Sequence, residues 1–275
     1  EEGKSVKDAE KDLDDLQNKI NQTENTVLKK EVKTGVEFYN LALDEKEARG
    51  DRISLFENVS FILNKTGKAY TFSLDKKSLI RKIAPEFVNA DIITGYSGKI
   101  YVYKQGAGVY ELQDKAVKRV VESDKEWGNI VDMQVYNGNI YLLDVGKGSI
   151  YKYSVTDSGF SGKVSYFKSA TIPGLESATS FAIDAAVYVA ADSNVYKYLS
   201  GSREDFSLQL PSEGIRITKI LTGKDVEHIY LWSKEEGAIY LFTKEGVYEK
   251  QILSESLKKG SDIVIYNNAA YILTG

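Results

Sequence analysis

Short apolar runs separated by tight turns recur along most of the chain. The clearest example is the segment 131–154, VDMQVYNGNIYLLDVGKGSIYKYS, in which alternating apolar positions predict three strands joined by two turns. An aromatic residue recurs in the second strand of each unit. These aromatic anchors, spaced by 40, 40, 47, 42 and 41 residues, are Phe61, Tyr101, Tyr141, Tyr188, Tyr230 and Tyr271. A repeat of about 40–45 residues with several strands per unit is typical of β-propeller blades.

A second set of tyrosines follows the anchors by about ten residues: Tyr70, Tyr110, Tyr151, Tyr196 and Tyr240. The turns between the two sets are rich in Gly and Asn, which accept the positive φ of tight hairpins. Each unit is therefore predicted to hold an inner strand, a hairpin to a second strand, a third strand and an outer strand. The expected inner strands are 53–55, 92–94, 133–136, 181–183, 219–221 and 263–266, and the expected outer strands are 79–83, 117–121, 164–167, 206–210 and 247–252.

The sixth unit reaches Gly275 where its second hairpin turn is due, so one outer strand is missing. The β-prone segment VEFYNLAL, residues 36–43, lies before the first unit and is the expected donor. Its pairing with the last unit would close the ring and leave no exposed sheet edge. The pattern thus predicts an all-β, six-bladed propeller, favoured over seven blades, across residues 34–275, with 34–43 as the closing strand.

Residues 1–33 are predicted to form a separate helix and linker. Apolar positions follow a 3-4 spacing, with Val6, Leu13, Ile20 and Val27 at one heptad position and Ala9, Leu16 and Thr23 at the other. β-Branched residues at the first position favour a two-stranded parallel coiled coil, which would make the chain a dimer through this seam. The alternative is the tail of a longer helix that packs on its own propeller or stays frayed.

Composition excludes several classes of function. The net charge of −4 gives no electrostatic drive toward nucleic acid, and the absence of cysteine excludes disulfides and thiolate metal sites. No apolar run is long enough to span a membrane. The chain begins in polar helical sequence without Met, which indicates a fragment of a longer protein. An extracytoplasmic location, tethered to a membrane by other segments, is favoured over a cytoplasmic one.

The units resemble the six-bladed propellers of the NHL and related families. The resemblance rests on an apolar, turn, Ile-Tyr pattern, best seen in residues 136–153 and 229–242, and it covers about 36–275. The segments FYNLALDEKEARGDRISLFENVSFILNKTGKAYTFSLDKKS and SFAIDAAVYVAADSNVYKYLSGSREDFSLQLP are also similar to the C-terminal propellers of bacterial multidomain proteins, some of which carry a PPM-type phosphatase module. That module's acidic metal-binding motifs are not visible here. The resemblance implies a non-catalytic sensor or interaction domain.

Polar residues recur at the predicted starts of the inner strands. Aligned on the anchors, they are Asp51, Asp91, Asp132, Thr179, Thr218 and Asp262, with Asp91 one residue out of register. Four carboxylates around one mouth of the channel would suit a divalent cation such as calcium, or a basic or hydroxyl-rich ligand. The alternative is that each Asp accepts backbone N–H bonds where one blade crosses to the next.

Two further side chains are candidates for a site. Trp127 lies in a polar loop between units and is the one aromatic candidate for contact with a ligand, whereas Trp232 follows an anchor and is expected to be buried. His228, the only histidine, lies in a charged hairpin extension without a nucleophile motif and is expected at the surface. The Gly-rich turns at 106–108 and 146–148 precede no helix, so they are hairpins rather than phosphate loops.

The sequence therefore favours a non-enzymatic domain that binds a protein, a small molecule or a glycan. Recognition is expected through one propeller face, with the loops that join the blades and the channel mouth. The alternative is a metal-dependent propeller hydrolase or lactonase with an acidic channel site. A third reading is an oligomerisation module driven by the helix.

Overall fold

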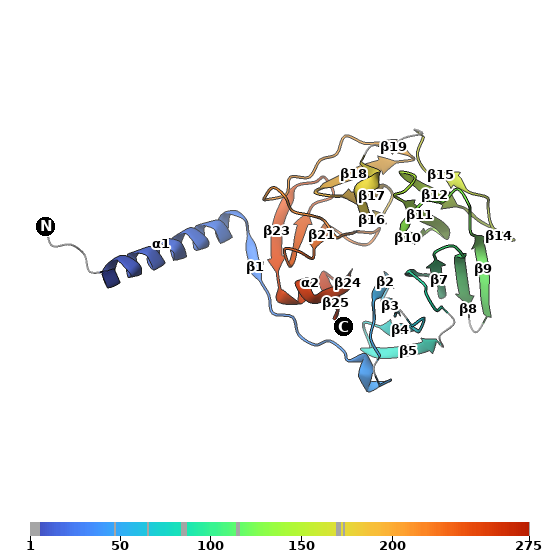
Figure 1. The fold of residues 1–275 in the computed structure, drawn as a ribbon, viewed down its shortest axis with the longest axis horizontal. Helices are drawn as coiled ribbons and strands as arrows, with labels where there is room; N and C mark the ends of the chain where they lie inside the picture. Colours follow the sequence, from blue (N-terminus) through green and yellow to red (C-terminus); the bar gives the residue numbers. More distant parts are fainter. Residues whose placement is uncertain are drawn as a thin grey trace.

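The strands form small sheets arranged radially around a central axis, as a β-propeller (Figure 1). The computed structural model describes residues 6–46, 48–64, 66–83, 87–113, 116–168, 172 and 174–274. Five blades each hold four strands in antiparallel order, with the inner strand at the axis and the outer strand at the rim. The β-propeller architecture predicted from the repeat is confirmed.

The blades follow the chain order. Blade one is β2 (Arg52–Phe56), β3 (Val59–Leu63), β4 (Ala69–Ser73) and β5 (Ser78–Ile83); blade two is β6 (Ile92–Tyr96), β7 (Lys99–Lys104), β8 (Gly108–Gln113) and β9 (Ala116–Glu122); blade three is β10 (Ile130–Tyr136), β11 (Asn139–Asp144), β12 (Ser149–Tyr153) and β15 (Val164–Ser165); blade four is β16 (Ala178–Ile183), β17 (Val187–Ala191), β18 (Asn194–Leu199) and β19 (Ser202–Arg203); blade five is β20 (Lys219–Leu221), β21 (Ile229–Ser233), β22 (Ala238–Phe242) and β23 (Tyr248–Leu253).

Several short elements lie outside the four-stranded sheets of the blades. A hairpin of β13 (Val155–Thr156) and β14 (Gly159–Phe160) follows β12, and a 3₁₀ turn, η2 (Leu175–Ser177), precedes β16. The outer strand of blade four is β19 rather than the predicted 206–210, where the structure has no strand. Tight turns join inner and second strands as expected: Asn137 and Gly138 both have positive φ, 48° and 77°, between β10 and β11.

The sixth repeat unit does not form a blade, so the predicted count of six is wrong and the propeller has five blades. This unit contributes a short helix, α2 (Glu255–Lys259), and a two-stranded sheet of β24 (Gly260–Tyr266) and β25 (Ala269–Thr274). The anchor spacing located the unit correctly because its inner hairpin is present. Within the described residues, no third or fourth strand pairs beyond β25.

The predicted closing strand at 34–43 is also corrected. The strand that joins the N-terminal region to the ring is β1 (Lys30–Val32), which pairs in parallel with β23 and widens blade five to five strands. Residues 33–40 are extended without strand pairing, and residues 41–43 form a 3₁₀ turn, η1 (Leu41–Leu43), capped by Asn40. This segment runs around the rim of the ring (Figure 1) and contacts β25 through side chains, since the Phe38 ring lies 4.8 Å from that of Tyr271.

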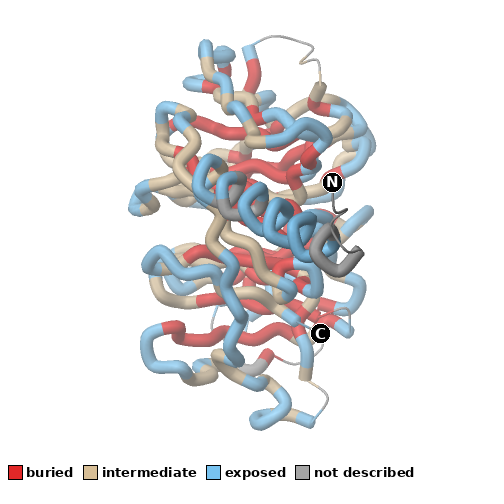
Figure 2. Tube along the Cα trace, turned by 90° about the vertical axis from the view of Figure 1, so that its left-hand side faces the viewer, coloured by how far each residue is buried: buried red, intermediate tan, exposed pale blue. Residues whose placement is uncertain are grey.

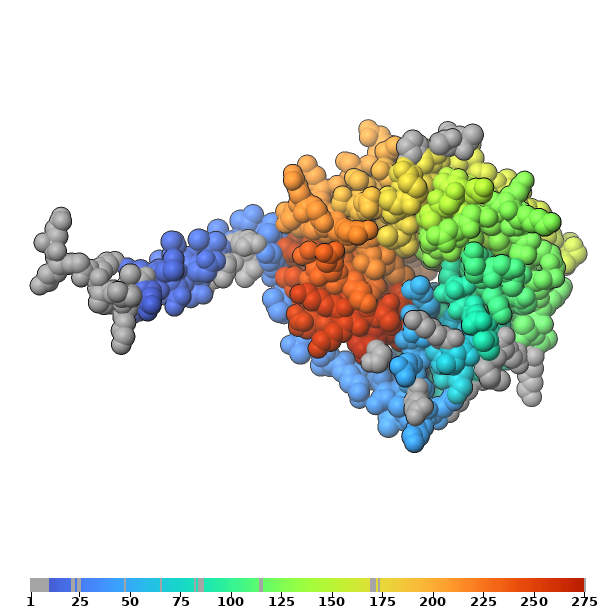
Figure 3. Space-filling view, in the orientation of Figure 1, coloured from blue at the N-terminus to red at the C-terminus, as the bar shows by residue number. Residues whose placement is uncertain are grey.

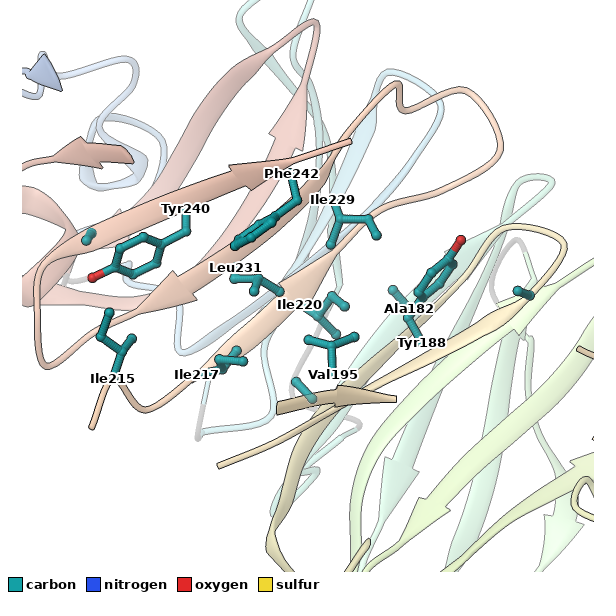
Figure 4. Close-up of a cluster of buried hydrophobic side chains, with 13 residues drawn as sticks. Ala182, Tyr188, Val195, Ile215, Ile217, Ile220, Ile229, Leu231, Tyr240 and Phe242 are labelled. Atoms are coloured by element: carbon teal, nitrogen blue, oxygen red, sulfur yellow. The ribbon is translucent and has the colours of Figure 1, made fainter. Parts of the chain in front are cut away.

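The hydrophobic core lies between neighbouring blades rather than in one central mass. Figure 4 shows one such cluster, where Ile220, Leu231 and Phe242 of blade five meet Ala182, Tyr188 and Val195 of blade four. The first five anchors are buried in these seams, with at most 6% of each side chain exposed. Their recurrence every 40–47 residues therefore reflects packing, since each blade presents an apolar face to the next. Buried and exposed segments alternate along the propeller in Figure 2.

The N-terminal helix, α1 (Val6–Val27), projects away from the ring (Figures 1 and 3). Its apolar seam faces solvent: Leu13 is 66%, Leu16 56%, Ile20 50% and Val27 70% exposed. The helix therefore does not pack on its own propeller through this seam, which was one of the two readings of the heptads. Neither α1 nor α2 combines the length and apolar character needed to cross a membrane.

Candidate functional site

One residue of each inner strand lies two positions before the residue that pairs with the aromatic anchor. These six equivalent positions are Arg52, Ile92, Asp132, Ser180, Lys219 and Asp262. They form a ring near the starts of the inner strands, at one end of the channel. The ring holds two basic and two acidic side chains, so it has mixed charge rather than the acidic character expected from the sequence.

Of the six residues that the sequence predicted for the ring, only Asp132 and Asp262 occupy these equivalent positions. Asp51, Asp91 and Thr218 each precede the ring residue of their strand by one position, and Thr179 is the extra residue of a β-bulge. Bulges interrupt β10, β16 and β24 just before the ring, whereas no register shift occurs in β2, β6 or β20. A bulge adds one residue and turns later side chains to the other face. A fixed count of residues back from the anchor therefore reaches one position in the strands with a bulge and a different position in the strands without one.

The displaced residues bond within or beside the strand starts. Asp91 Oδ2 accepts a hydrogen bond from Gln105 N at 2.8 Å, and Thr218 Oγ1 accepts one from Lys234 N at 3.0 Å, so each caps the turn after the second strand of its own blade. Thr179 Oγ1 donates to Ile217 O at 3.0 Å and links blade four to the chain that enters blade five. Asp51 is partly exposed, and its main-chain N–H donates to Leu63 O at 2.8 Å.

The two ring carboxylates join neighbouring inner strands. Asp132 accepts from Met133 N at 2.8 Å and from Phe181 N of blade four at 3.0 Å. Asp262 accepts from Ile263 N at 2.8 Å and from Ile53 N of blade one at 2.9 Å. The hydroxyl of Ser180 also joins neighbouring inner strands, since it accepts a hydrogen bond from Ile220 N of blade five at 2.8 Å. These contacts match the backbone-bonding alternative that the sequence left open for the Asp residues.

Lys219 reaches across the channel end toward the sixth unit. Its Nζ lies 2.6 Å from Asp262 Oδ1 and 3.1 Å from Ile263 O. Burial raises the pKa of Asp132 to about 6, although the nearby Lys219 charge and the N–H donors of Phe181 and Met133 act in the opposite direction. Among the described residues, no three His, Asp or Glu side chains converge on a point where they could hold a metal ion.

Trp127 packs between blades two and three. Its Nε1 donates to Tyr153 Oη at 3.1 Å, and its ring lies 6.0 Å from that of Tyr103, centroid to centroid. The side chain is partly buried, so a large part of its surface is already used inside the protein. His228, expected at the surface, has its side chain 20% exposed, and its Nε2 lies 2.9 Å from Glu249 Oε2.

A second candidate site lies at the opposite end of the inner strands. A groove of about 530 Å³ is bordered by the turns that follow the inner strands of blades three, four and five. Its wall includes Tyr136, the last residue of β10, whereas Asp132 of the ring lies near the start of that strand. We call this site the lysine groove; its principal side chains are Tyr136, Asp184, Tyr188, Lys197, Lys224 and Lys244.

The three lysines of the groove are held differently. Lys244 is fixed: its Nζ donates to Asp184 Oδ2 at 2.7 Å and to Gly223 O at 3.3 Å, and it also bonds the Thr222 hydroxyl. The Nζ of Lys197 lies over the Tyr188 and Phe206 rings, 5.4 and 5.3 Å from their centroids. Lys224 is exposed. Neither Lys197 nor Lys224 has an ion-pair partner in the described part of the chain.

Acidic side chains offset part of the positive charge of the groove. Burial acts to raise the pKa of Asp184, but the hydrogen bonds from Lys244, Ala186 N and Ala185 N outweigh it and lower that pKa below its ordinary value. Asp184 therefore stays ionised and neutralises Lys244. Glu204 is exposed at the rim, and the charge of Lys197 also acts on the exposed carboxylate of Glu245 and contributes to lowering its pKa, after the hydrogen bonds from the Thr243 hydroxyl and the Glu245 backbone.

The sequence reasoning missed this groove because its residues are far apart along the chain. Lys197, Lys224 and Lys244 belong to two neighbouring units, and only the stacking of blades four and five brings them to one opening. A signal was present for two of them, since Lys224 and Lys244 lie in or beside turns on the same side of blade five, whereas Lys197 lies within β18. Aligning turns rather than anchors would have grouped those two.

Comparison with known proteins supports the fold. No family model and no curated protein sequence matches this chain. Among solved structures, virginiamycin B lyase from Staphylococcus aureus is 12% identical with a TM-score of 0.58, over 82% of this chain and 77% of that chain. A streptogramin B lyase is 13% identical with a TM-score of 0.60, over 82% and 78%. Regucalcin from Agrobacterium tumefaciens, a calcium-binding protein, is 11% identical with a TM-score of 0.56, over 86% and 84%. At such identities, the likeness establishes the β-propeller fold alone.

Proposed function

We propose that this propeller is a non-enzymatic binding domain that recognises an acidic ligand in the lysine groove. The observation that carries the proposal is the pair Lys197 and Lys224, two cations without ion-pair partners in the described residues, beside the aromatic side chain of Tyr136.

The groove chemistry suits a carboxylate-bearing peptide or glycan. An ammonium group is a strong hydrogen-bond donor to carboxylate oxygens, and charge-assisted bonds of this kind are roughly twice as strong as neutral ones. Lys244 is held by Asp184 and by backbone oxygen, so one wall of the groove is ordered before a ligand arrives. Such order reduces the entropy lost on binding. The expected ligand therefore places an acidic group between Lys197 and Lys224.

A metal-dependent hydrolase or lactonase is the alternative. The calcium-binding description of the regucalcin neighbour is a reason to test it. In this chain, Asp132 and Asp262 are each engaged by two backbone N–H donors, and Lys219 bonds the carboxylate of Asp262. A cation at the ring would have to compete with these bonds, so we favour the binding domain. A calcium titration that raises the melting temperature of the wild type but not of Asp132→Ala would favour the alternative.

The test of the leading proposal uses a fluorescein-labelled Glu₁₀ peptide, with Lys₁₀ as the reference of opposite charge. Fluorescence anisotropy at low salt should detect the acidic peptide only. The Lys197→Glu/Lys224→Glu double variant should weaken its binding at least tenfold. Lys147→Glu/Lys152→Glu carries the same change of charge in blade three and should bind as the wild type does. Equal weakening in both variants would show that net charge alone attracts the peptide, and the groove would be rejected.

Three further features belong to the same proposal. As a sensor or interaction domain of the kind found in bacterial multidomain proteins, the propeller would act within a longer chain. Placement outside the cytoplasm, through a membrane tether in other segments, remains our expectation.

The exposed seam of α1 supports self-association, with two propellers held at one end of a short coiled coil. Two grooves on one dimer would then bind a repeating acidic ligand with greater avidity.

A further inference from the structure

Most of the inner strands end in an aromatic residue. The last residues of β2, β6, β10 and β24 are Phe56, Tyr96, Tyr136 and Tyr266. Every unit begins with its inner strand and returns by an antiparallel hairpin, so the inner strands run the same way along the channel. These four side chains, which we call the aromatic arc, therefore lie at the channel end that also holds the lysine groove.

The aromatic arc is continuous. It belongs to unit six and blades one, two and three, which follow one another around the axis (Figure 1). The rings of Phe56 and Tyr96 lie 4.9 Å apart, centroid to centroid. A Cβ atom at Gly138 would lie 3.8 Å from Cε1 of Tyr96, so that ring reaches the turn that follows Tyr136. Three neighbouring blades thus present their aromatic side chains side by side.

Each side chain of the arc is held by the protein and still partly exposed. Phe56 packs on the apolar cluster between blades one and two, Tyr96 on the next cluster and Tyr136 on the one after it. The hydroxyl of Tyr266 donates to Asp75 Oδ1 at 2.7 Å. All four aromatic side chains keep part of their surface in contact with solvent. A ligand would therefore meet rings that are already ordered, which lowers the entropy lost on binding.

The turns beside the arc carry small polar side chains. Ser97, Asn137, Asn267 and Asn268 follow the ends of β6, β10 and β24, and all four are exposed. Amide and hydroxyl groups both donate and accept hydrogen bonds, so they suit a ligand rich in hydroxyls. Glu57, after β2, is the charged residue that follows directly on a strand of the arc. The surface thus combines aromatic faces with groups that are mostly neutral and polar.

Tyr136 belongs both to the arc and to the wall of the lysine groove. The same channel end therefore offers aromatic faces, neutral polar groups and the ammonium groups of Lys197 and Lys224. A uronic acid unit carries a counterpart to each of these: an apolar face of C–H groups, several hydroxyls and a carboxylate. The electron-rich face of an aromatic ring attracts such C–H groups. An acidic peptide such as polyglutamate supplies the carboxylates but no flat apolar face on each unit.

We propose that this end of the propeller binds an acidic polysaccharide built of uronic acid units. One or more carboxylates bind Lys197 and Lys224, and the following sugars stack along the arc on Tyr136, Tyr96 and Phe56. The inference rests on the proposed function of the lysine groove and narrows its ligand to a glycan. The arc also sets the direction of the chain, which leaves the groove toward blade two.

The test compares fluorescein-labelled hexagalacturonate with the labelled Glu₁₀ peptide by fluorescence anisotropy. Phe56→Leu/Tyr96→Leu keeps apolar side chains in the seams but removes two flat rings. It should weaken hexagalacturonate binding at least tenfold and leave peptide binding unchanged. Tyr96→Leu alone, the milder variant for the case that the double variant does not fold, should weaken it at least threefold. The control, Tyr110→Leu, changes a partly buried tyrosine on the third strand of blade two and should leave both affinities unchanged.

The lysine variant separates failure of this inference from failure of the proposed function. Lys197→Glu/Lys224→Glu should weaken the binding of both probes. If it does so while the leucine variants bind hexagalacturonate as the wild type does, the groove stands and the glycan proposal is overturned. Equal loss of both probes in the leucine variants would also overturn it, because the arc would then serve an acidic peptide. If the lysine variant binds both probes normally, the proposed function itself fails, and this inference with it.

Discussion

The ammonium group of Lys219 lies 2.6 Å from Oδ1 of Asp262, so an ion pair ties blade five to the sixth repeat unit. The Asp262 side chain is 9% exposed and that of Lys219 is 19% exposed. Through its other oxygen, Asp262 holds Ile53 N of blade one at 2.9 Å. One carboxylate therefore connects both neighbours of the incomplete unit, at the place where the ring has the fewest buried apolar residues.

Replacing Lys219 with Met should lower the free energy of unfolding by about 3 kcal/mol, because the Asp262 charge would stay buried without its counter-ion. Urea denaturation of the wild type and the variant measures this. Arg119→Met breaks an exposed ion pair with Glu122 and should change stability by less than about 0.5 kcal/mol. The Lys219→Met/Asp262→Asn variant should lose less than the two single losses combined. Strict additivity would show that the two side chains are not coupled.

Asp132 should make stability depend on pH. Its pKa of about 6 in the folded protein lies above the ordinary value of 3.8, so between these values the folded state holds more protons than the unfolded state. Stability relative to Asp132→Asn should therefore fall as pH rises from about 4 to 6 and stay level above about 7, with a total change of roughly 1–3 kcal/mol. Chemical denaturation at each pH measures both proteins. A difference that is constant from pH 4 to 7 would contradict the raised pKa.

Trp127 should stabilise the seam between blades two and three through its bond to Tyr153. Tyr153→Phe removes the acceptor, and Trp127→Phe removes the donor; each should cost about 1 kcal/mol or more of unfolding free energy. In the double variant, the second change should cost about 1 kcal/mol less than it does alone, as thermal or urea unfolding can show. If Trp127→Phe instead leaves stability unchanged but abolishes ligand binding, Trp127 is the contact residue that its loop position indicated.

The exposed seam of α1 should support a weak dimer. Sedimentation of the wild type should show a mass that rises with concentration toward twice the 30.7 kDa of one chain. Leu13→Lys/Ile20→Lys places charges in the seam and should keep the protein monomeric. Asn18→Lys, on the opposite side of the heptad, is the control and should leave the dimer intact. A wild type that stays monomeric at 100 μM would show that α1 does not pair with itself.

The sequence determined the propeller because each blade must repeat the same apolar pattern, and a period of about 40 residues is visible without knowledge of tertiary contacts. The helix of heptad character and the buried anchors followed from the same kind of local pattern. Trp232, expected to be buried, is 1% exposed. These features depend on the spacing of residues within a unit, which the sequence displays directly.

Tertiary structure alone decided the blade count, the chemistry of the ring and the lysine groove. A bulge shifts which side chain points toward the channel, so Arg52 and Lys219 joined Asp132 and Asp262 in the ring in place of Asp51, Asp91 and Thr218. Strand pairing depends on whether an edge comes within hydrogen-bonding distance, which placed β1 on β23 and left 34–43 unpaired. The groove exists because packing between units brings distant lysines to one opening. Contacts between units are set by packing in three dimensions, and no spacing along the chain records them.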